Sequence, residues 1–267
     1  MRKHDDGFNL EKKENAILDV VELEKDLINN YCDVVVVLTK CTLMSIQSIY
    51  KIDAYKVRLI QNGLYDFNFV ADKNILKKEF KISLTEKILL FVGRLDDNKN
   101  LPFLIKVFNN VLLKDEDVRL IVVGSGNFIT PLLYAYPNYS NITFTGFLNK
   151  EELHKFYLIA DIGVIPSRYE EFGYVAVEMM MHGLPVIANN SGGLSEIIEN
   201  DISGKLLNLF NGKNEEESVD ILSDSILDLL KNESEMSRLG RNARKRYLKC
   251  FEIMNYREKM LKVYNEL

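Results

Sequence analysis

The stretch that decides the fold is residues 162–188, IGVIPSRYEEFGYVAVEMMMHGLPVIA. Short β-branched and apolar runs stand at its two ends, residues 162–165 and 185–188, and the segment between them reads as a loop followed by a helix. Two apolar strands joined in this way form the crossover unit of a buried parallel sheet. The stretch therefore predicts strand, loop, helix and strand at the centre of an α/β protein.

The same alternation of strand-length and helical patterns continues on both sides of this stretch. Five further strand-length runs precede it, at residues 34–38, 58–60, 88–92, 120–123 and 142–145, and helical patterns follow most of them. Amphipathic helices are also predicted at 222–230, 236–250 and 253–267. Open parallel sheets bind ligands at the carboxyl ends of their strands, so the loops after residues 92, 123, 145, 165 and 188 are the candidate site.

Composition excludes several classes of protein. The 267 residues are 47% hydrophobic and 27% charged, which is typical of a folded globular chain. The formal net charge of −5 disfavours nucleic-acid partners. Cys32, Cys41 and Cys250 lack the spacing of zinc or redox sites and fit a reducing cytoplasm. The polar residues 1–6 predict no signal peptide, and no apolar run approaches the roughly 18 residues that cross a bilayer.

The residues 61–68, QNGLYDFN, have neither helical nor strand periodicity and contain Asn-Gly, so they predict a linker with a domain boundary near residue 66. We divide the chain into residues 1–66, a second domain at 67–250, and a final helix at 251–267. The first segment is too short to form a sizeable core of its own.

One candidate loop is residues 91–100, FVGRLDDNKN. Gly93 lets a ligand approach the backbone after the strand, and two cations, Arg94 and Lys99, follow it. Arg94 offers a planar fork of donors and Lys99 a point charge, which together suit a diphosphate. The alternative is that both cations pair with Asp96 and Asp97 on a solvated loop.

The second candidate loop carries two carboxylates, Glu170 and Glu178. If the helix begins near Phe172, the amides of Phe172, Gly173 and Tyr174 point out of its N-terminus toward an anion. Carboxylates accept paired hydroxyl groups well, so Glu178 could hold a ribose diol and Glu170 the hydroxyls of a sugar. The alternative makes Glu170 a helix-dipole residue and Glu178 a surface glutamate.

Other motifs carry less chemistry. Gly192 and Gly193 allow either a close ligand approach or a tight turn. His182 is expected to cap a helix rather than to catalyse, and His154 has no partner pattern. The sequence Gly-Ser-Gly at 124–126 lacks the third glycine of a dinucleotide fingerprint, so we expect no bound NAD.

Taken together, these motifs resemble the family 4 retaining glycosyltransferases. Gly93-Arg94-Leu95 with Lys99-Asn100 is similar to the diphosphate clamp of that family, and Glu170 with Glu178 is similar to its Glu-x7-Glu signature. Further motifs follow the family's order, at residues 33–38, 60–63, 145–147, 182–188 and 192–196. The resemblance covers about residues 17–265 and implies a GT-B fold, in which two Rossmann-like domains face each other and the C-terminal one binds a nucleotide sugar.

The resemblance also implies roles for single residues. Arg94 and Lys99 would neutralise the diphosphate, and Glu170 and Glu178 would hold the transferred sugar and the ribose. The remaining contacts would be made by the backbone: the loop at Gly146 and Phe147 would meet the base, and the amides of Phe172, Gly173 and Tyr174 would meet the sugar and the distal phosphate. Such an enzyme needs no metal and no cofactor besides its substrate, a UDP- or GDP-sugar.

The chain departs from the family in three ways. Glu171 stands where the family usually has Gly, and Ser195 stands where it usually has Pro. Most of the family's N-terminal, acceptor-side domain is absent, so residues 1–66 resemble its last elements only, and 251–267 the helix that crosses back to it. An incomplete domain of this kind predicts self-association or a partner chain that supplies the acceptor domain.

The expected function is that of a hexosyltransferase acting on a saccharide or glycolipid acceptor in the synthesis of a bacterial surface polysaccharide. We expect a cytoplasmic protein, with peripheral attachment at the inner face of the membrane as the alternative. Other hypotheses are a non-catalytic nucleotide-sugar-binding module, a degenerate remnant, and a non-hydrolysing sugar-nucleotide epimerase.

Overall fold

The computed structural model describes residues 6–67 and 71–267, so most of the polar N-terminus and the end of the predicted linker lie outside the described part. The chain divides into a larger unit, Asn62–Glu258, and a smaller unit formed by the residues up to Gln61 together with Lys259–Leu267. The assignment of residues 1–66 as part of an acceptor-side domain stays a prediction.

The larger unit contains a six-stranded parallel sheet with the strand order β5-β4-β3-β6-β7-β8. Its strands are β3 (Lys87–Val92), β4 (Val118–Val123), β5 (Ile142–Gly146), β6 (Ile162–Ile165), β7 (Val186–Asn189) and β8 (Lys205–Leu207). The predicted α/β class is confirmed. The strand β8 escaped prediction because it has only 3 residues and no apolar run longer than two.

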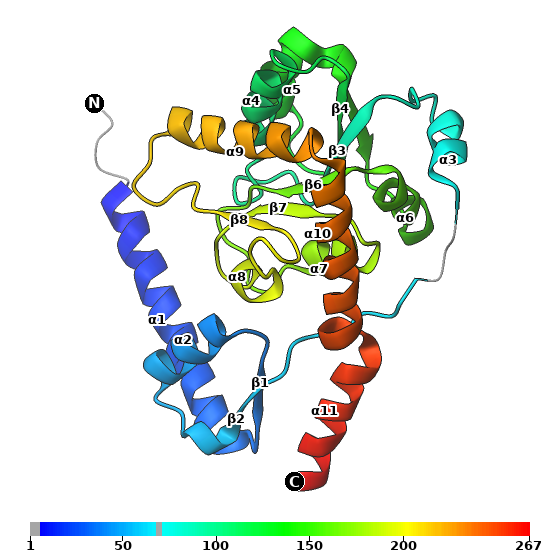
Figure 1. Cartoon of the computed structure of the whole chain (residues 1–267). Coiled ribbons are helices and arrows are strands. Elements are labelled where there is room, and N and C mark those ends of the chain that lie inside the picture. Colours follow the sequence, from blue (N-terminus) through cyan, green and yellow to red (C-terminus); the bar gives the residue numbers. More distant parts are fainter. Residues whose placement is uncertain (1–5, 68–70) are drawn as a thin grey trace. The chain divides into compact units, whose positions relative to one another are not determined.

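Helices cover the sheet (Figure 1). They are α3 (Lys73–Glu79), α4 (Leu101–Leu112), α5 (Ile129–Ala135), α6 (Lys150–Ile159), α7 (Tyr174–Met181), α8 (Leu194–Ile197), α9 (Glu215–Leu230) and α10 (Glu233–Arg246). A final helix, α11 (Ile253–Glu266), ends in the smaller unit. The expected start of α9 at residue 222 was wrong, because Asn214 and Glu217 form a capping box that begins the helix earlier. The expected helix 236–250 also begins earlier, capped by Asn232, and turns into a π-helix at Tyr247–Phe251.

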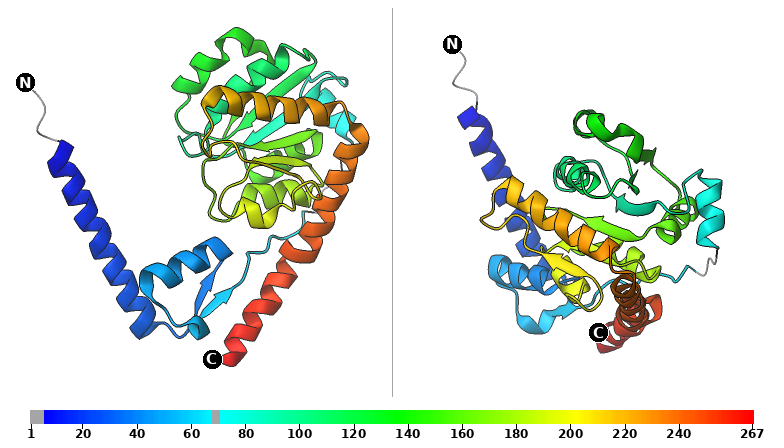
Figure 2. Two further views of the ribbon diagram at one scale, coloured as in Figure 1. Left: turned by 60° about the vertical axis from the view of Figure 1, so that its left-hand side comes forward. Right: turned by 45° about the horizontal axis from the view of Figure 1, so that its top comes forward.

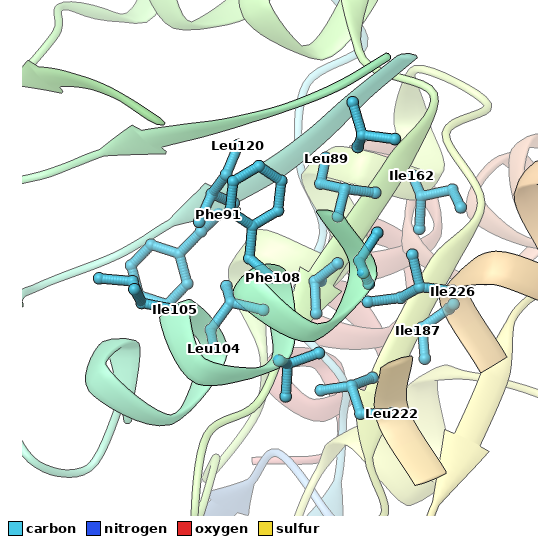
Figure 3. Close-up of a cluster of buried hydrophobic side chains, with 14 of the residues drawn as sticks. Leu89, Phe91, Leu104, Ile105, Phe108, Leu120, Ile162, Ile187, Leu222 and Ile226 are labelled. Carbon is cyan, nitrogen blue, oxygen red and sulfur yellow. The ribbon is translucent and has the colours of Figure 1, made fainter. Parts of the chain in front are cut away.

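The two faces of the sheet bury different helices (Figure 2). On one face, α4 packs against α5 and α9. Leu89 and Phe91 of β3 point to this face and join Phe108 of α4 and Ile226 of α9 in one apolar cluster (Figure 3). On the other face, a Cβ at Gly163 of β6 would lie 2.3 Å from the sulfur of Met179, so α7 packs directly on the strand. Burial on both faces explains why the strands are continuously apolar.

The strand order places a topological switch point at the centre of the sheet. The chain passes from β3 outward to β4 and β5, and then returns to β6 on the opposite side of β3 before continuing to β7 and β8. The loops after β3 and β6 therefore leave neighbouring strands in opposite directions and open a crevice between them. These are the two loops in which the sequence predicts binding residues.

The smaller unit contains α1 (Asp6–Tyr31), β1 (Val35–Val37), α2 (Lys40–Tyr50) and β2 (Val57–Leu59). The two strands pair in parallel and lie next to α2 (Figure 2). Val37, Ile52 and Val57 form its small core. Arg58 pairs with Glu266 at 3.1 Å, which ties the end of α11 to this unit.

Within the described residues, every helix is too short or too polar to cross a membrane.

We predict that the cluster around Phe108 carries much of the stability of the larger unit. Phe108 is fully buried, so Phe108→Ala should lower the free energy of unfolding by about 3–5 kcal/mol in urea denaturation. Leu113 follows the same helix and is 83% exposed, so Leu113→Ala should change it by less than about 0.5 kcal/mol. Equal losses in the two variants would contradict this account of the core.

Candidate functional site

The loop after β3 packs tightly against the loop after β4. Gly124 has a φ of 143°, and a Cβ at that position would lie 1.8 Å from the carbonyl oxygen of Gly93. Leu95 N–H donates to the carbonyl of Ser125 at 2.9 Å, and Asn127 N–H donates to that of Leu95 at 3.0 Å. The glycines of 124–126 therefore serve the packing of these two loops.

Asn98 joins the loop after β3 to the loop after β6. Its side-chain amide donates to the carbonyl of Tyr169 at 2.8 Å, and its side-chain oxygen accepts from the Tyr169 N–H at 3.1 Å. Its own carbonyl accepts from the Arg168 N–H at 2.8 Å. Three hydrogen bonds from one asparagine thus hold the two candidate loops together. Sequence reasoning missed this residue.

These bonds bring Lys99 and Glu170 together. The Lys99 ammonium forms an ion pair with Glu170, and the two side chains are only 17% and 14% exposed. The Ser167 hydroxyl donates to the same Glu170 oxygen at 2.7 Å. The alternative in which Lys99 pairs with a neighbouring aspartate is therefore not observed, although Asp96 does accept from the Lys99 backbone N–H at 3.0 Å.

Arg94 lies at the rim of the crevice. Its guanidinium group contacts Asp96 at 3.0 Å, and its side chain is 80% exposed. For Arg94 the solvated ion pair considered above is what the structure contains. An exposed pair of this kind contributes little to stability, so the guanidinium can turn toward a ligand at small cost.

The loop after β7 supports the backbone around Glu170. Gly192 has a φ of 51°, and a Cβ there would lie 2.1 Å from the Glu170 carbonyl oxygen. The Gly193 N–H donates to that same oxygen at 2.7 Å. Of the two interpretations of this glycine pair, the tight turn is observed, and the close contacts there are made by the protein's own backbone.

The helix α7 begins at Tyr174, with Gly173 as its N-cap at a φ of 102°, and not near Phe172. The amides of Tyr174 and its successor Val175 lie in the first turn and have no partner within the helix. Phe172 is buried and precedes the cap, so its amide lies outside the first turn. The Tyr174 hydroxyl is hydrogen-bonded by the Asn62 side chain.

Glu178 lies half-buried on α7, where the Tyr157 hydroxyl donates to its Oε2 at 2.6 Å. Burial raises the pKa of Glu178, and the hydrogen bond from Tyr157 and the charge of Lys150 partly offset the rise. Burial also raises the pKa of Tyr157 well above its usual value of 10.0, so the phenol keeps its proton. The interpretation of Glu178 as a surface glutamate is wrong.

His182 caps the C-terminus of α7, as predicted. Its Nδ1 lies 2.8 Å from the carbonyl oxygen of Glu178, so Nδ1 carries the proton. Its Nε2 then accepts from Nδ1–H of His154 at 2.7 Å. Burial is the main cause that lowers the pKa of both histidines, that of His154 to about 4. No local pattern predicts this pair, because His154 lies on α6 and His182 at the end of α7.

Gly146 is the last residue of β5, and Phe147 follows it. The carbonyl of Gly146 accepts from the Gly124 N–H at 2.9 Å, which joins this turn to the loop after β4. Gly146 has a φ of 75°, and Phe147 is exposed. Since β5 is the edge strand, this turn lies at the outer end of the row of loops that begins at β3 and β6.

The site thus combines a cation and a carboxylate in the crevice, a helix N-terminus beside them and a second carboxylate on the same helix. Among the side chains that the structure describes, no three His, Cys, Asp or Glu residues group as metal ligands. Hydroxyl-rich anionic ligands suit such an arrangement, because carboxylates accept from hydroxyls while cations and amides neutralise phosphate.

Comparison with known proteins identifies the family. The profile described as "Glycosyl transferases group 1" matches residues 72–246. The chain belongs to this family. The match covers every residue of the candidate site, and it favours a glycosyltransferase over the epimerase that the sequence left open.

Individual proteins agree with the family. An uncharacterised glycosyltransferase of Methanocaldococcus jannaschii is 35% identical over 178 residues, which is 64% of this chain and 45% of that protein. Sucrose-phosphate synthase from Thermosynechococcus elongatus has a similar structure, with a TM-score of 0.79 and 26% identity over 92% of this chain and 61% of the other.

HepE from Anabaena, solved in complex with UDP, also shares the fold at a TM-score of 0.81, with 19% identity over 92% of this chain and 67% of its own. The predicted relation to the GT-B glycosyltransferases is confirmed. The chain spans about half the length of the curated relatives that it matches.

We predict that the two paired histidines make stability fall on acidification. The unfolded chain protonates histidine near pH 6.5, whereas folded His154 resists protonation until about pH 4. The free energy of unfolding should therefore decrease as the pH falls from 6.5 toward 4. In urea denaturation at pH 7 and pH 5, His154→Asn should lose less stability between the two pH values than the unaltered chain. The same loss in both would contradict the lowered pKa.

Proposed function

We propose that the chain binds a UDP- or GDP-sugar in the crevice between the loops after β3 and β6 and serves the transfer of its sugar, with retained configuration, to a saccharide or glycoconjugate acceptor. The observation that carries the proposal is the close pairing of Lys99 with Glu170 beside the N-terminus of α7. Membership of the glycosyltransferase family and the UDP-bound state of HepE support it.

The diphosphate would bind between Lys99, Arg94 and the first amides of α7. Lys99 has three N–H donors, so it can bond a phosphate oxygen while it keeps contact with Glu170. Arg94 would leave its exposed pair with Asp96 and close over the diphosphate from the rim. The positive end of α7, which begins after Gly173, adds the backbone donors of Tyr174 and Val175 on the same side.

The two carboxylates would accept hydrogen bonds from hydroxyl groups of the nucleotide sugar. Ser167 and Lys99 fix one oxygen of Glu170, so its other oxygen remains to accept from the transferred sugar. Glu178 would accept from the two hydroxyls of the ribose. The turn at Gly146 and Phe147 would meet the base through its backbone, which favours neither uracil nor guanine.

In the transfer, the bond between the anomeric carbon and the diphosphate oxygen breaks, the acceptor hydroxyl oxygen bonds to the same face of that carbon, and the hydroxyl proton passes to the departing diphosphate. Negative charge develops on the departing diphosphate, where Lys99, Arg94 and the amides of α7 would stabilise it. The chain would thereby supply with fixed cations and dipoles the stabilisation that other transferases obtain from a metal ion. The expected pathway is the synthesis of a bacterial surface polysaccharide.

A second candidate is a nucleotide-sugar-binding half that needs a separate chain for its acceptor. The smaller unit favours it, since the sheet described there has two strands of 3 residues each. The two candidates differ in what the lone chain does with a nucleotide sugar and a saccharide acceptor. If it released UDP or GDP, the chain would be a complete transferase and this second candidate would be wrong.

We predict micromolar binding of UDP or GDP and of their sugar conjugates in calorimetric titration. Arg94→Ala and Glu178→Ala each remove a charged hydrogen-bond partner and should weaken binding by about 10- to 100-fold. Lys106→Ala is the control, because Lys106 forms a surface pair with Glu215 outside the site. A chain with no affinity for any of these nucleotides would contradict the proposal, as would a Glu178→Ala variant with unchanged affinity.

A further inference from the structure

Tyr157 is a core residue whose hydroxyl reaches the binding site. Its side chain is 2% exposed, and it lies on α6. The hydroxyl donates at 2.6 Å to Glu178, the carboxylate to which we assign the ribose. None of the motifs in the sequence pointed to this tyrosine.

Glu178 is held at two points by one packed group. Tyr157 holds the carboxylate, and Nδ1–H of His182 holds the backbone carbonyl of the same residue at 2.8 Å. The rings of Tyr157 and His182 stack with their centroids 4.9 Å apart and 29° between their planes. His154 completes the group through its hydrogen bond to His182. The long side chain of Glu178 is therefore ordered before any ligand arrives.

The partner of Tyr157 differs from that of the other buried tyrosine hydroxyl in this unit. Tyr247 donates to a backbone carbonyl, that of Leu64, at 2.9 Å. A buried phenol needs only some acceptor, and a carbonyl provides it at no electrostatic cost. Tyr157 instead uses a half-buried carboxylate at the edge of the site, where desolvation disfavours the charge. The contact thus does more than satisfy the tyrosine.

We propose that Tyr157 is a positioning residue for nucleotide recognition: its hydroxyl fixes the Glu178 carboxylate so that the remaining lone pairs meet the cis-diol of a nucleoside diphosphate. The inference rests on the proposed role of Glu178. A carboxylate offers about four acceptor positions, of which Tyr157 takes one, so a bidentate contact with two ribose hydroxyls is still open.

The same hydrogen bond favours the ionised form of Glu178 and opposes the effect of burial. Burial raises the pKa of the carboxyl group, and the bond from Tyr157 lowers it. The charged or titratable groups around Glu178 and its histidine support come from several elements: Tyr157, His154 and Lys150 from α6, His182 at the end of α7, Arg244 from α10 and Asp66 from the segment after β2. Removal of the phenol hydroxyl should therefore move the protonation of Glu178 to a higher pH.

The test is Tyr157→Phe in the full chain, titrated by calorimetry between pH 5 and pH 8 with UDP and GDP and with their 2′,3′-dideoxy analogues. At pH 7, affinity for the diol-containing nucleotide should fall about 5- to 20-fold, as expected for a lost hydrogen bond to a charged group. Affinity for the dideoxy analogue should stay unchanged. The pH at which diol-dependent binding is lost on acidification should be higher in the variant.

Tyr247→Phe is the matched control, since it removes an equally buried hydroxyl that bonds a backbone carbonyl instead of Glu178. It should leave both affinities unchanged. In Glu178→Gln, the further change Tyr157→Phe should cost far less than it does alone, because the two residues act through one contact.

Equal weakening of diol and dideoxy ligands by Tyr157→Phe would show a general structural effect and overturn the positioning role, as would unchanged binding of both. Failure of the unaltered chain to bind UDP or GDP would overturn the proposed function and this role with it. The titrations therefore distinguish failure of the positioning role of Tyr157 from failure of the proposed function.

Discussion

The pairing of β3 with β6 is the constraint on which the site depends. Leu89 and Leu90 of β3 register with Ile162 and Gly163 of β6, although the two strands are separated in the chain by β4 and β5. Asp161 reinforces the junction, since its carboxylate accepts from the Ile88 N–H at 2.8 Å. Once these strands are neighbours, the loops that follow them start side by side at one edge of the sheet, and the Asn98 bonds hold the two loops together.

The candidate site contains two carboxylates, Glu170 and Glu178, whose surroundings differ. Glu170 is paired with Lys99 and hydrogen-bonded by Ser167, so one of its oxygens is already engaged. Glu178 has no hydrogen bond from a cation among the described residues, and the phenol of Tyr157 donates to it instead. The proposed roles agree with this difference in partners, because Lys99 at Glu170 is a cation that can also bond a phosphate, whereas Glu178 can accept hydrogen bonds from hydroxyl groups.

Local sequence signals predicted the strands 88–92, 120–123 and 162–165 and the loops that carry Gly93, Lys99 and Glu170. They failed where a contact joins distant residues. Asn98 and Tyr169 are 71 positions apart, and Tyr157 and Glu178 are 21 apart on two helices, so neither pair has a local pattern. The early start of α9 could have been predicted, because Asn214 and Glu217 have the spacing of a capping box. The pairing of Arg94 with Asp96 was also foreseeable as one of two outcomes.

The most direct test of the central claim is amide hydrogen exchange of the chain with and without saturating UDP or GDP. If the junction of β3 and β6 creates the site, the nucleotide should slow exchange in residues 93–100, in 146–150 and at the start of α7, and leave the opposite ends of the strands unchanged. Protection centred elsewhere, for example on the groove lined by Gly183, Gly240 and Arg241, would contradict the account.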